Sequence, residues 1–142
     1  MKRGCLFTFL ITVATPFVGL FLLLTIPVML NDQKLNALED RFLAYPLPPE
    51  THLTDHTAES SIALRGNGNH CDYQVTISLY TSLPENKIID YYNKADIQGV
   101  EAERAPVTVY FREVPEAGDS PMKAFLLRLS DSTDAGLDLR CH

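Results

Sequence analysis

The chain contains no tryptophan, only three cysteines and no excess of positive charge, because 12 Lys and Arg residues stand against 18 Asp and Glu residues, a formal net charge of −6. Proteins that bind nucleic acid carry a basic patch or stripe, so we expect no nucleic-acid partner. The sequence also lacks a glycine-rich nucleotide loop and the spaced Cys and His pairs of a zinc finger, and it therefore predicts no cofactor. A length of 142 residues allows one ordinary domain.

What the sequence does have is a long hydrophobic run near its N-terminus. Residues 6–30 are uncharged, and as a helix rising about 1.5 Å per residue they extend roughly 37 Å, enough to cross a hydrocarbon core of about 30 Å. Lys2 and Arg3 precede the run, so the positive-inside rule predicts a cytoplasmic segment at 1–5. We expect a single-pass protein of the inner or plasma membrane that contacts the lipid bilayer through residues 6–30, with an extracytoplasmic domain that is periplasmic in a Gram-negative cell.

A cleaved signal peptide has the same basic start and is the competing interpretation. The hydrophobic region of such a peptide has about 7 to 15 residues and ends at a small-x-small cleavage site. This run is longer, and the nearby match Thr12-Val13-Ala14 lies in its middle. The sequence therefore favours an uncleaved signal anchor. Cys5, just before the run, is either an unpaired thiol or a palmitoylation site.

Residues 31–59 are predicted to connect this anchor to the domain. Leu35, Leu38 and Phe42 recur at helical spacing, which indicates a short amphipathic juxtamembrane helix that continues from the anchor. The sequence Pro-Leu-Pro-Pro at 46–49 ends that helix. We expect it to form an extended, semi-rigid linker that lifts the domain off the membrane.

Residues 60–142 carry the signals of a small α+β domain. Apolar and polar residues alternate over 73–80, which predicts a strand with one buried face. Ser82 and Glu85 have the spacing of a capping box and predict a helix from there to about residue 95. The other strands are expected at 61–65, 107–112, 124–130 and 137–141. The order strand, strand, helix, strand, strand, strand predicts an antiparallel sheet packed on one helix.

Cys71 and Cys141 both lie in the exported part, where a disulfide is the default for two cysteines. Side chains two apart on a strand share a face. By this parity Cys71 belongs to the buried face of its strand, and Cys141 lies on the same face as Leu137 and Leu139. We therefore expect a Cys71–Cys141 disulfide in the core.

A structural zinc site is the alternative, because His70 and His142 are the immediate neighbours of the two cysteines and complete a two-Cys, two-His ligand set. Adjacent residues on a strand face opposite ways, so one ion cannot easily collect both pairs. The sequence therefore favours the disulfide and predicts no metal.

The solvent side of the predicted sheet collects tyrosine, arginine and histidine. Tyr and Arg are favoured at protein–protein hot spots, and a flat sheet offers a platform for a partner, although an ordinary solvated face has the same pattern. The residues that we expect to form a partner-binding face are Tyr80, Tyr110, Arg112, Arg128, Arg140, His70 and His142. The predicted function is binding of another envelope protein, in an accessory or immunity-type role.

Two other functions remain open from the sequence. His70 and His142 favour a small-ligand or metal-sensing module. Asp72 beside His70 is the nearest approach to a hydrolytic site, but the pair has no third member, and we predict no catalytic residues.

One group of proteins shares the arrangement of these motifs. Gly66-Asn67-Gly68-Asn69-His70-Cys71-Asp72-Tyr73 precedes Ser82-Leu83-Pro84-Glu85, and the following helix ends with Tyr91-Tyr92. Over Tyr45 to Ser130 the chain resembles small, mostly uncharacterised bacterial membrane-anchored envelope proteins. The resemblance implies an envelope location and brings no assigned activity or functional residues.

Overall fold

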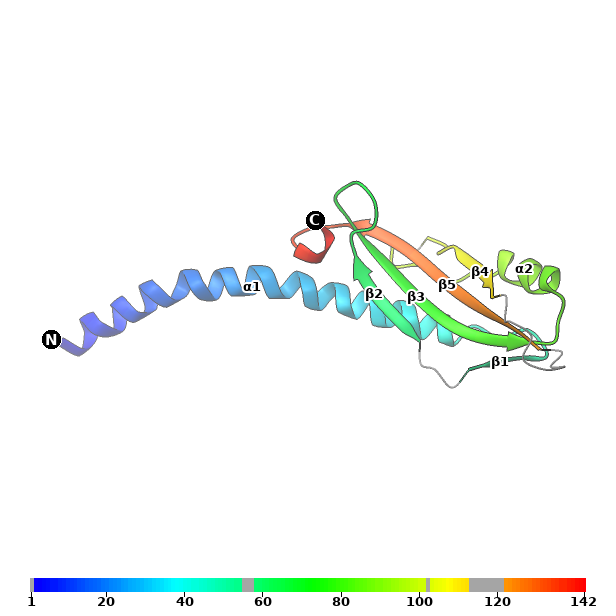
Figure 1. Cartoon of the computed structure of the whole chain (residues 1–142). Coiled ribbons are helices and arrows are strands. Elements are labelled where there is room, and N and C mark those ends of the chain that lie inside the picture. Colours follow the sequence, from blue (N-terminus) through cyan, green and yellow to red (C-terminus); the bar gives the residue numbers. More distant parts are fainter. Residues whose placement is uncertain (1, 55–57, 102, 113–121) are drawn as a thin grey trace.

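A computed structural model describes residues 2–54, 58–101, 103–112 and 122–142, and for residues 2–11 it describes the backbone alone (Figure 1). Met1, the first residue of the predicted cytoplasmic segment, lies outside the described residues. The described elements are α1 (Lys2–Leu43), β1 (Thr51–Leu53), β2 (Glu59–Ala63), β3 (His70–Thr81), α2 (Glu85–Asn93), β4 (Val107–Phe111), β5 (Lys123–Asp134) and a 3₁₀ turn, η1 (Leu139–Cys141).

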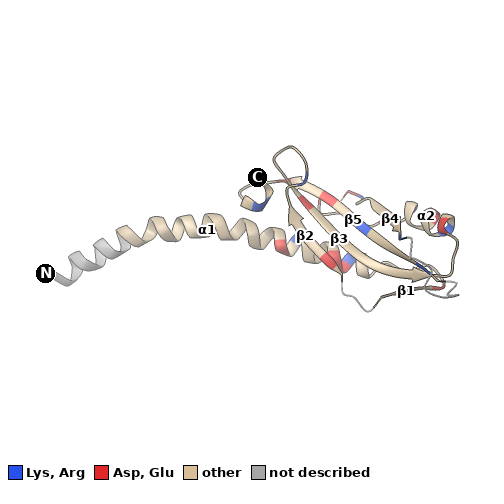
Figure 2. Ribbon diagram, viewed as in Figure 1, with Lys and Arg blue, Asp and Glu red and all other residues tan. Residues whose placement is uncertain are grey.

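Helix α1 is one continuous helix of 42 residues that passes through Pro16 and Pro27. Among the described residues it is the one helix long and apolar enough to cross a membrane, by length and composition. Figure 2 shows a long stretch of α1 without a charged residue before the helix reaches the sheet. From Phe17 to Leu30 its large apolar side chains are exposed, so the domain does not cover them.

The last three turns of α1 belong to the domain itself. Leu35, Leu38 and Phe42 are buried in the same core as the sheet, so the predicted amphipathic helix forms as a direct continuation of the anchor. The linker prediction at 46–49 is wrong. Pro48 is buried, Leu47 packs against the core and the Pro46 carbonyl accepts a hydrogen bond from the Tyr91 hydroxyl at 2.8 Å. The segment returns onto the domain, where the Pro48 ring is buried, while Pro46 and Pro49 are exposed.

The five strands form one antiparallel sheet in the order β1-β3-β5-β4, and β2 pairs with β3 beside β1. Every second residue of β3, from Cys71 to Thr81, is buried, and Phe125, Leu127 and Leu129 of β5 face the same way. The predicted α+β fold and its alternation are therefore confirmed. Because one face is apolar on every second residue, it must be covered, and both α1 and α2 cover it instead of the single helix predicted.

Two differences concern the strands. An additional short strand, β1, pairs with the end of β3, where the sequence predicted only a connection. The strand predicted at 137–141 is instead the turn η1. Around Cys71 both neighbouring positions are already occupied, by Thr133 of β5 and by the end of β2 at Ala63, so β3 offers no free edge for a last strand.

The start of α2 also differs from the prediction. Pro84 is the N-cap residue and no side chain caps the helix. The Ser82 hydroxyl donates to the Glu50 carboxylate, and Glu85 forms an ion pair with Lys123 at 2.9 Å. The predicted capping box is therefore wrong, because both of its side chains have partners from other parts of the sheet.

Candidate functional site

Two polar regions of the domain are candidates for function. We call the first the clamp and define it as Asn31, Asp138, Arg140 and the Cys71–Cys141 disulfide. We call the second the open face and define it as the side of the sheet that neither α1 nor α2 covers. Its residues include Asp72, Gln74, Thr76, Ser78 and Tyr80 of β3, Leu126, Arg128, Ser130 and Ser132 of β5, and Thr108 and Tyr110 of β4.

The clamp contains the predicted disulfide. Cys71 on β3 and Cys141 on η1 are bonded, 70 residues apart in the sequence, and both are fully buried. The pair was predicted from side chains two apart on a strand sharing a face, and for Cys141 that argument is wrong. Leu137 and Leu139 are exposed, whereas Cys141 is buried. Of these three residues Cys141 alone is buried, because residues 139–141 form a 3₁₀ turn and do not alternate as a strand does.

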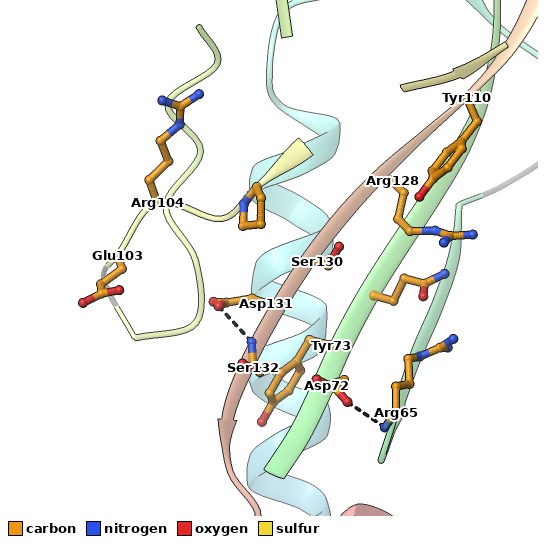
Figure 3. Close-up of a pocket in the computed structure, with 12 residues that line it drawn as sticks. Arg65, Asp72, Tyr73, Glu103, Arg104, Tyr110, Arg128, Ser130, Asp131 and Ser132 are labelled. Carbon is orange, nitrogen blue, oxygen red and sulfur yellow. Dashed lines mark hydrogen bonds between the residues drawn. The ribbon is translucent and has the colours of Figure 1, made fainter. Parts of the chain in front are cut away.

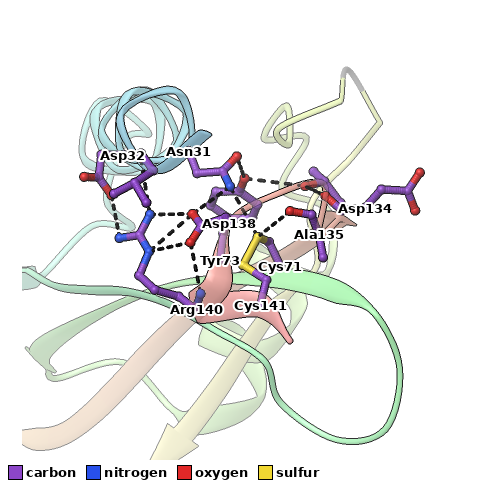
Figure 4. Close-up of polar contacts among 11 residues, drawn as sticks. Asn31, Asp32, Cys71, Tyr73, Asp134, Ala135, Asp138, Arg140 and Cys141 are labelled. Carbon is purple, nitrogen blue, oxygen red and sulfur yellow. Dashed lines mark hydrogen bonds and ion pairs between the residues drawn. A yellow bond between two sulfur atoms is a disulfide. The ribbon is translucent and has the colours of Figure 1, made fainter. Parts of the chain in front are cut away.

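Asp138 is the centre of the clamp (Figure 4). Its fully buried carboxylate accepts hydrogen bonds from Arg140 Nε at 3.0 Å and Nη2 at 2.7 Å, and from Asn31 Nδ2 at 2.9 Å. A buried carboxylate is stable only when paired and hydrogen-bonded, and here it has both. The hydrogen bonds from Arg140 lower the pKa of Asp138 from 3.8 to about 2, against the opposing effect of burial.

The clamp joins the C-terminus of the chain to α1. Arg140 also donates to Asp32 Oδ1 at 2.8 Å and to the Val28 carbonyl at 3.3 Å, so its guanidinium bridges the buried Asp138 and the exposed side of α1. On its other side, Asn31 accepts a hydrogen bond from the buried Tyr73 hydroxyl at 2.8 Å. Helix α1, the central strand β3 and the C-terminal turn are therefore held as one unit.

This arrangement corrects two predicted members of the partner-binding face. Arg140 does not lie on the sheet, because its charge is used to neutralise Asp138 and Asp32. His142 follows η1 and its Nε2 lies 3.1 Å from the Gly136 carbonyl. Both residues belong to the C-terminal turn.

The open face brings together two of the predicted residues. The Arg128 guanidinium carbon lies 4.9 Å from the centroid of the Tyr110 ring, a cation–π arrangement. Arg128 Nε is buried and has no hydrogen-bond partner among the described residues. Buried polar groups are normally paired, and the described residues supply no acceptor for this donor.

A shallow hollow of about 460 Å³ lies over this part of the sheet (Figure 3). Arg65, Tyr110 and Arg128 line one side of it, and Glu103 and Arg104 of the loop before β4 line the other. The hollow is wide and open, which suits contact with a surface better than enclosure of a small substrate.

The loop that borders the hollow is fixed by contacts with α1 and β5. Arg41 of α1 donates to the carbonyls of Gln98 and Gly99, each at 2.9 Å, and Asp131 of β5 accepts from the Val100 amide. A β-carbon at Gly99 would lie 2.2 Å from an Asp131 carboxylate oxygen, so this close approach requires glycine.

The remaining predicted residues lie around the margin of the open face. His70 Nε2 is 3.1 Å from Asp72 Oδ2 and 3.3 Å from the Arg65 carbonyl, and Asp72 also accepts from the Arg65 amide at 2.7 Å. The pair is thus engaged in holding the loop between β2 and β3. At the other end, the Tyr80 ring lies 5.4 Å from that of His52, and Arg112 is exposed after β4.

The alternative metal site is not assembled as the sequence suggested. The potential ligands that come closest among the described residues are Cys71, Cys141 and Asp138, within 4.8 Å of one another. The two sulfurs are bonded to each other and the carboxylate is saturated by Arg140 and Asn31, so in this oxidised state none of them is free to bind a cation.

Sequence reasoning missed Asn31, Asp138 and Tyr73 as members of one network. Asn31 and Asp138 are 107 residues apart, and each looks like an ordinary polar residue in its own segment. The one signal in the sequence that could have pointed to the network is position. Asn31 directly follows the apolar run, and Asp138 lies three residues before Cys141.

The sequence and the fold were compared with protein-family models, with curated proteins and with solved structures, and none of the three comparisons finds a match.

Proposed function

We propose that this chain is a single-pass protein of the cell envelope whose α1 spans the membrane and whose extracytoplasmic domain binds another envelope protein through the open face. The observation that carries the proposal is the unpaired Arg128 Nε beside the Tyr110 ring on the uncovered side of the sheet. Arg and Tyr are the residues that most often dominate the energy of protein–protein contacts.

The charges of the open face indicate the chemistry of the partner. Asp72 is already engaged, because it accepts from the Arg65 amide and pairs with His70. Two arginine side chains that line the hollow, Arg65 and Arg128, form no ion pair among the described residues. The Arg65 guanidinium donates to the Ser61 hydroxyl at 3.0 Å, and Arg128 contacts the Tyr110 ring. The partner is therefore expected to present carboxylate or carbonyl oxygens.

The rigid attachment of the domain to α1 supports the same function. Because α1 enters the core without a linker, a partner bound to the open face is held at a fixed height and orientation above the bilayer. An accessory or immunity-type protein that must meet a neighbour in the same membrane gains from this preorganisation, since less orientational freedom is lost on binding.

Site-specific photocrosslinking in intact membranes tests the proposal. A photoreactive phenylalanine analogue replaces Tyr110, which is 43% exposed, and in a matched control it replaces Ile89 of α2, which is 40% exposed. We expect a defined adduct from position 110 alone, and its loss when Arg128→Ala is added. Equal capture at both positions, or no adduct at position 110 under conditions where the protein is folded, contradicts the proposal.

A further inference from the structure

The C-terminal turn carries the two most exposed large hydrophobic side chains outside α1 among the described residues. Leu137 is 57% exposed and Leu139 is 68% exposed. Every other large hydrophobic side chain in the described part of the chain that is more than half exposed lies on α1 between Phe17 and Leu30, in the apolar run. Two such leucines on a small domain therefore need a partner that covers them.

The clamp fixes the height of this turn along α1. Arg140 bonds the Val28 carbonyl and the Asp32 carboxylate, and Asp138 bonds Asn31, so η1 lies beside the helical turn where the apolar run ends. Figure 1 shows η1, in red, at the end of the domain that faces the N-terminal part of α1. An open groove of about 610 Å³ joins Leu137 to Pro27 and Leu30 of α1, and Gln33, Lys34 and Asp134 line the same groove.

The length of the apolar run sets where the bilayer lies along α1. A run of roughly 37 Å exceeds a hydrocarbon core of about 30 Å by four or five helical residues, so its last residues lie in the interfacial layer. Pro27 and Leu30 of this end line the groove with Leu137, and Leu139 precedes Arg140, which bonds the Val28 carbonyl. A position at this depth leaves the leucines among lipid and keeps Lys34 near the headgroups, where long basic side chains favour the interface.

We infer that the C-terminal turn is a second membrane contact, in which Leu137 and Leu139 enter the interfacial layer of the bilayer beside α1. This inference rests on the proposed membrane span of α1 and adds to it. A single helix can rotate and tilt in a membrane, whereas a helix with a disulfide-closed turn beside it meets the bilayer on a defined side. The contact therefore sets which way the open face points.

The absence of tryptophan makes a direct measurement possible, because one introduced tryptophan is then the sole indole fluorophore. Leu137→Trp and Leu139→Trp are made separately in the full chain and reconstituted in phosphatidylcholine vesicles that contain lipids brominated at shallow or deep positions of the acyl chains. Leu20→Trp reports the span of α1, and Leu53→Trp, on β1 at the other end of the sheet, is the control on the domain surface. Near-ultraviolet circular dichroism of the tyrosines verifies the fold of each variant.

We expect shallow brominated lipid to quench Leu137→Trp or Leu139→Trp at least twofold more than Leu53→Trp, with a blue-shifted emission maximum, and deep brominated lipid to quench Leu20→Trp. If Leu20→Trp is quenched and both turn positions match Leu53→Trp, the second contact is overturned while the membrane span stands. If Leu20→Trp is not quenched, the span itself fails and the contact fails with it. A blue shift at both turn positions without quenching by lipid also overturns the inference, because it shows that protein covers the leucines.

Discussion

The two sides of the sheet differ in how completely their polar groups are satisfied. On the covered side, the clamp gives the fully buried Asp138 three side-chain donors and gives the Tyr73 hydroxyl an acceptor. On the open face, Arg128 Nε has no partner in the described part of the chain although it is buried. The same strands supply both sides, since β3 and β5 alternate residue by residue. The difference is the observation on which the proposed partner contact of the open face rests.

The covered side has one exception that limits this contrast. The Tyr92 hydroxyl of α2 is buried without a described partner, and burial raises the pKa of Tyr92 well above its ordinary value. Tyr92 packs with Tyr91 and Tyr45, at ring distances of 5.1 and 6.4 Å. Its ring supplies apolar contact that offsets the cost of the unpaired hydroxyl.

Removal of the disulfide is the strongest way to break the covered side. The double change Cys71→Ala and Cys141→Ala opens a loop of 70 residues, and the chain-entropy model then predicts a loss of about 4 kcal/mol in the free energy of unfolding. Denaturant titration of the full chain in detergent, followed by tyrosine circular dichroism, measures the loss. A change below about 1 kcal/mol would show that the clamp's hydrogen bonds hold the turn without the covalent bond.

A pair of leucines on one strand compares the two sides directly. Leu129 is fully buried between Val75 and Val107 on the covered side, whereas Leu126 lies on the open face and is half-buried. Leu129→Ala is expected to destabilise by about 3 kcal/mol, because it removes buried contacts and leaves a cavity. Leu126→Ala is expected to cost about 1 kcal/mol or less in the same titration. Equal losses would contradict the assignment of the two sides.

Acid should weaken the clamp in a defined pH range. The pKa of Asp138 is lowered from 3.8 to about 2 in the folded protein, so its contribution is complete above about pH 4 and is lost as the pH falls towards 2. A shift of this size corresponds to about 2 kcal/mol. Other carboxylates titrate in the same range, and the informative quantity is therefore the difference between wild type and Asp138→Asn, which should shrink from pH 5 to pH 2. A constant difference would show that the Asp138 charge adds nothing to stability.

Changes on the open face should have the smallest effect on folding. Tyr110→Ala removes an exposed ring and one cation–π contact, so the unfolding free energy is expected to fall by no more than about 1 kcal/mol. The same variant should lose the crosslinked partner when the photoreactive residue is moved to Arg112, which is exposed nearby. A loss of several kcal/mol would instead make Tyr110 a structural residue and remove the contrast between the two sides.

Local pattern was enough to predict much of the fold, because alternation and helical spacing depend on which face must be buried. It predicted the buried sides of β3 and β5, the helix after Ser82, the amphipathic end of α1 and the pairing of Cys71 with Cys141. It failed at 137–141, where alternation alone cannot reveal that both neighbours of β3 are already present. It also failed at Ser82 and Glu85, whose partners Glu50 and Lys123 lie more than 30 positions away in the sequence.

The sequence by itself determined that this protein has an uncharged helical run long enough for a membrane and a sheet with one apolar face, because both properties depend on the order of residues along a single element. Only the tertiary structure decided that the run continues into the core, that Asn31 meets Asp138, and that Leu137 and Leu139 stay outside at the end of the apolar run. Those contacts join residues about a hundred positions apart, and their formation depends on the packing of the whole sheet against α1.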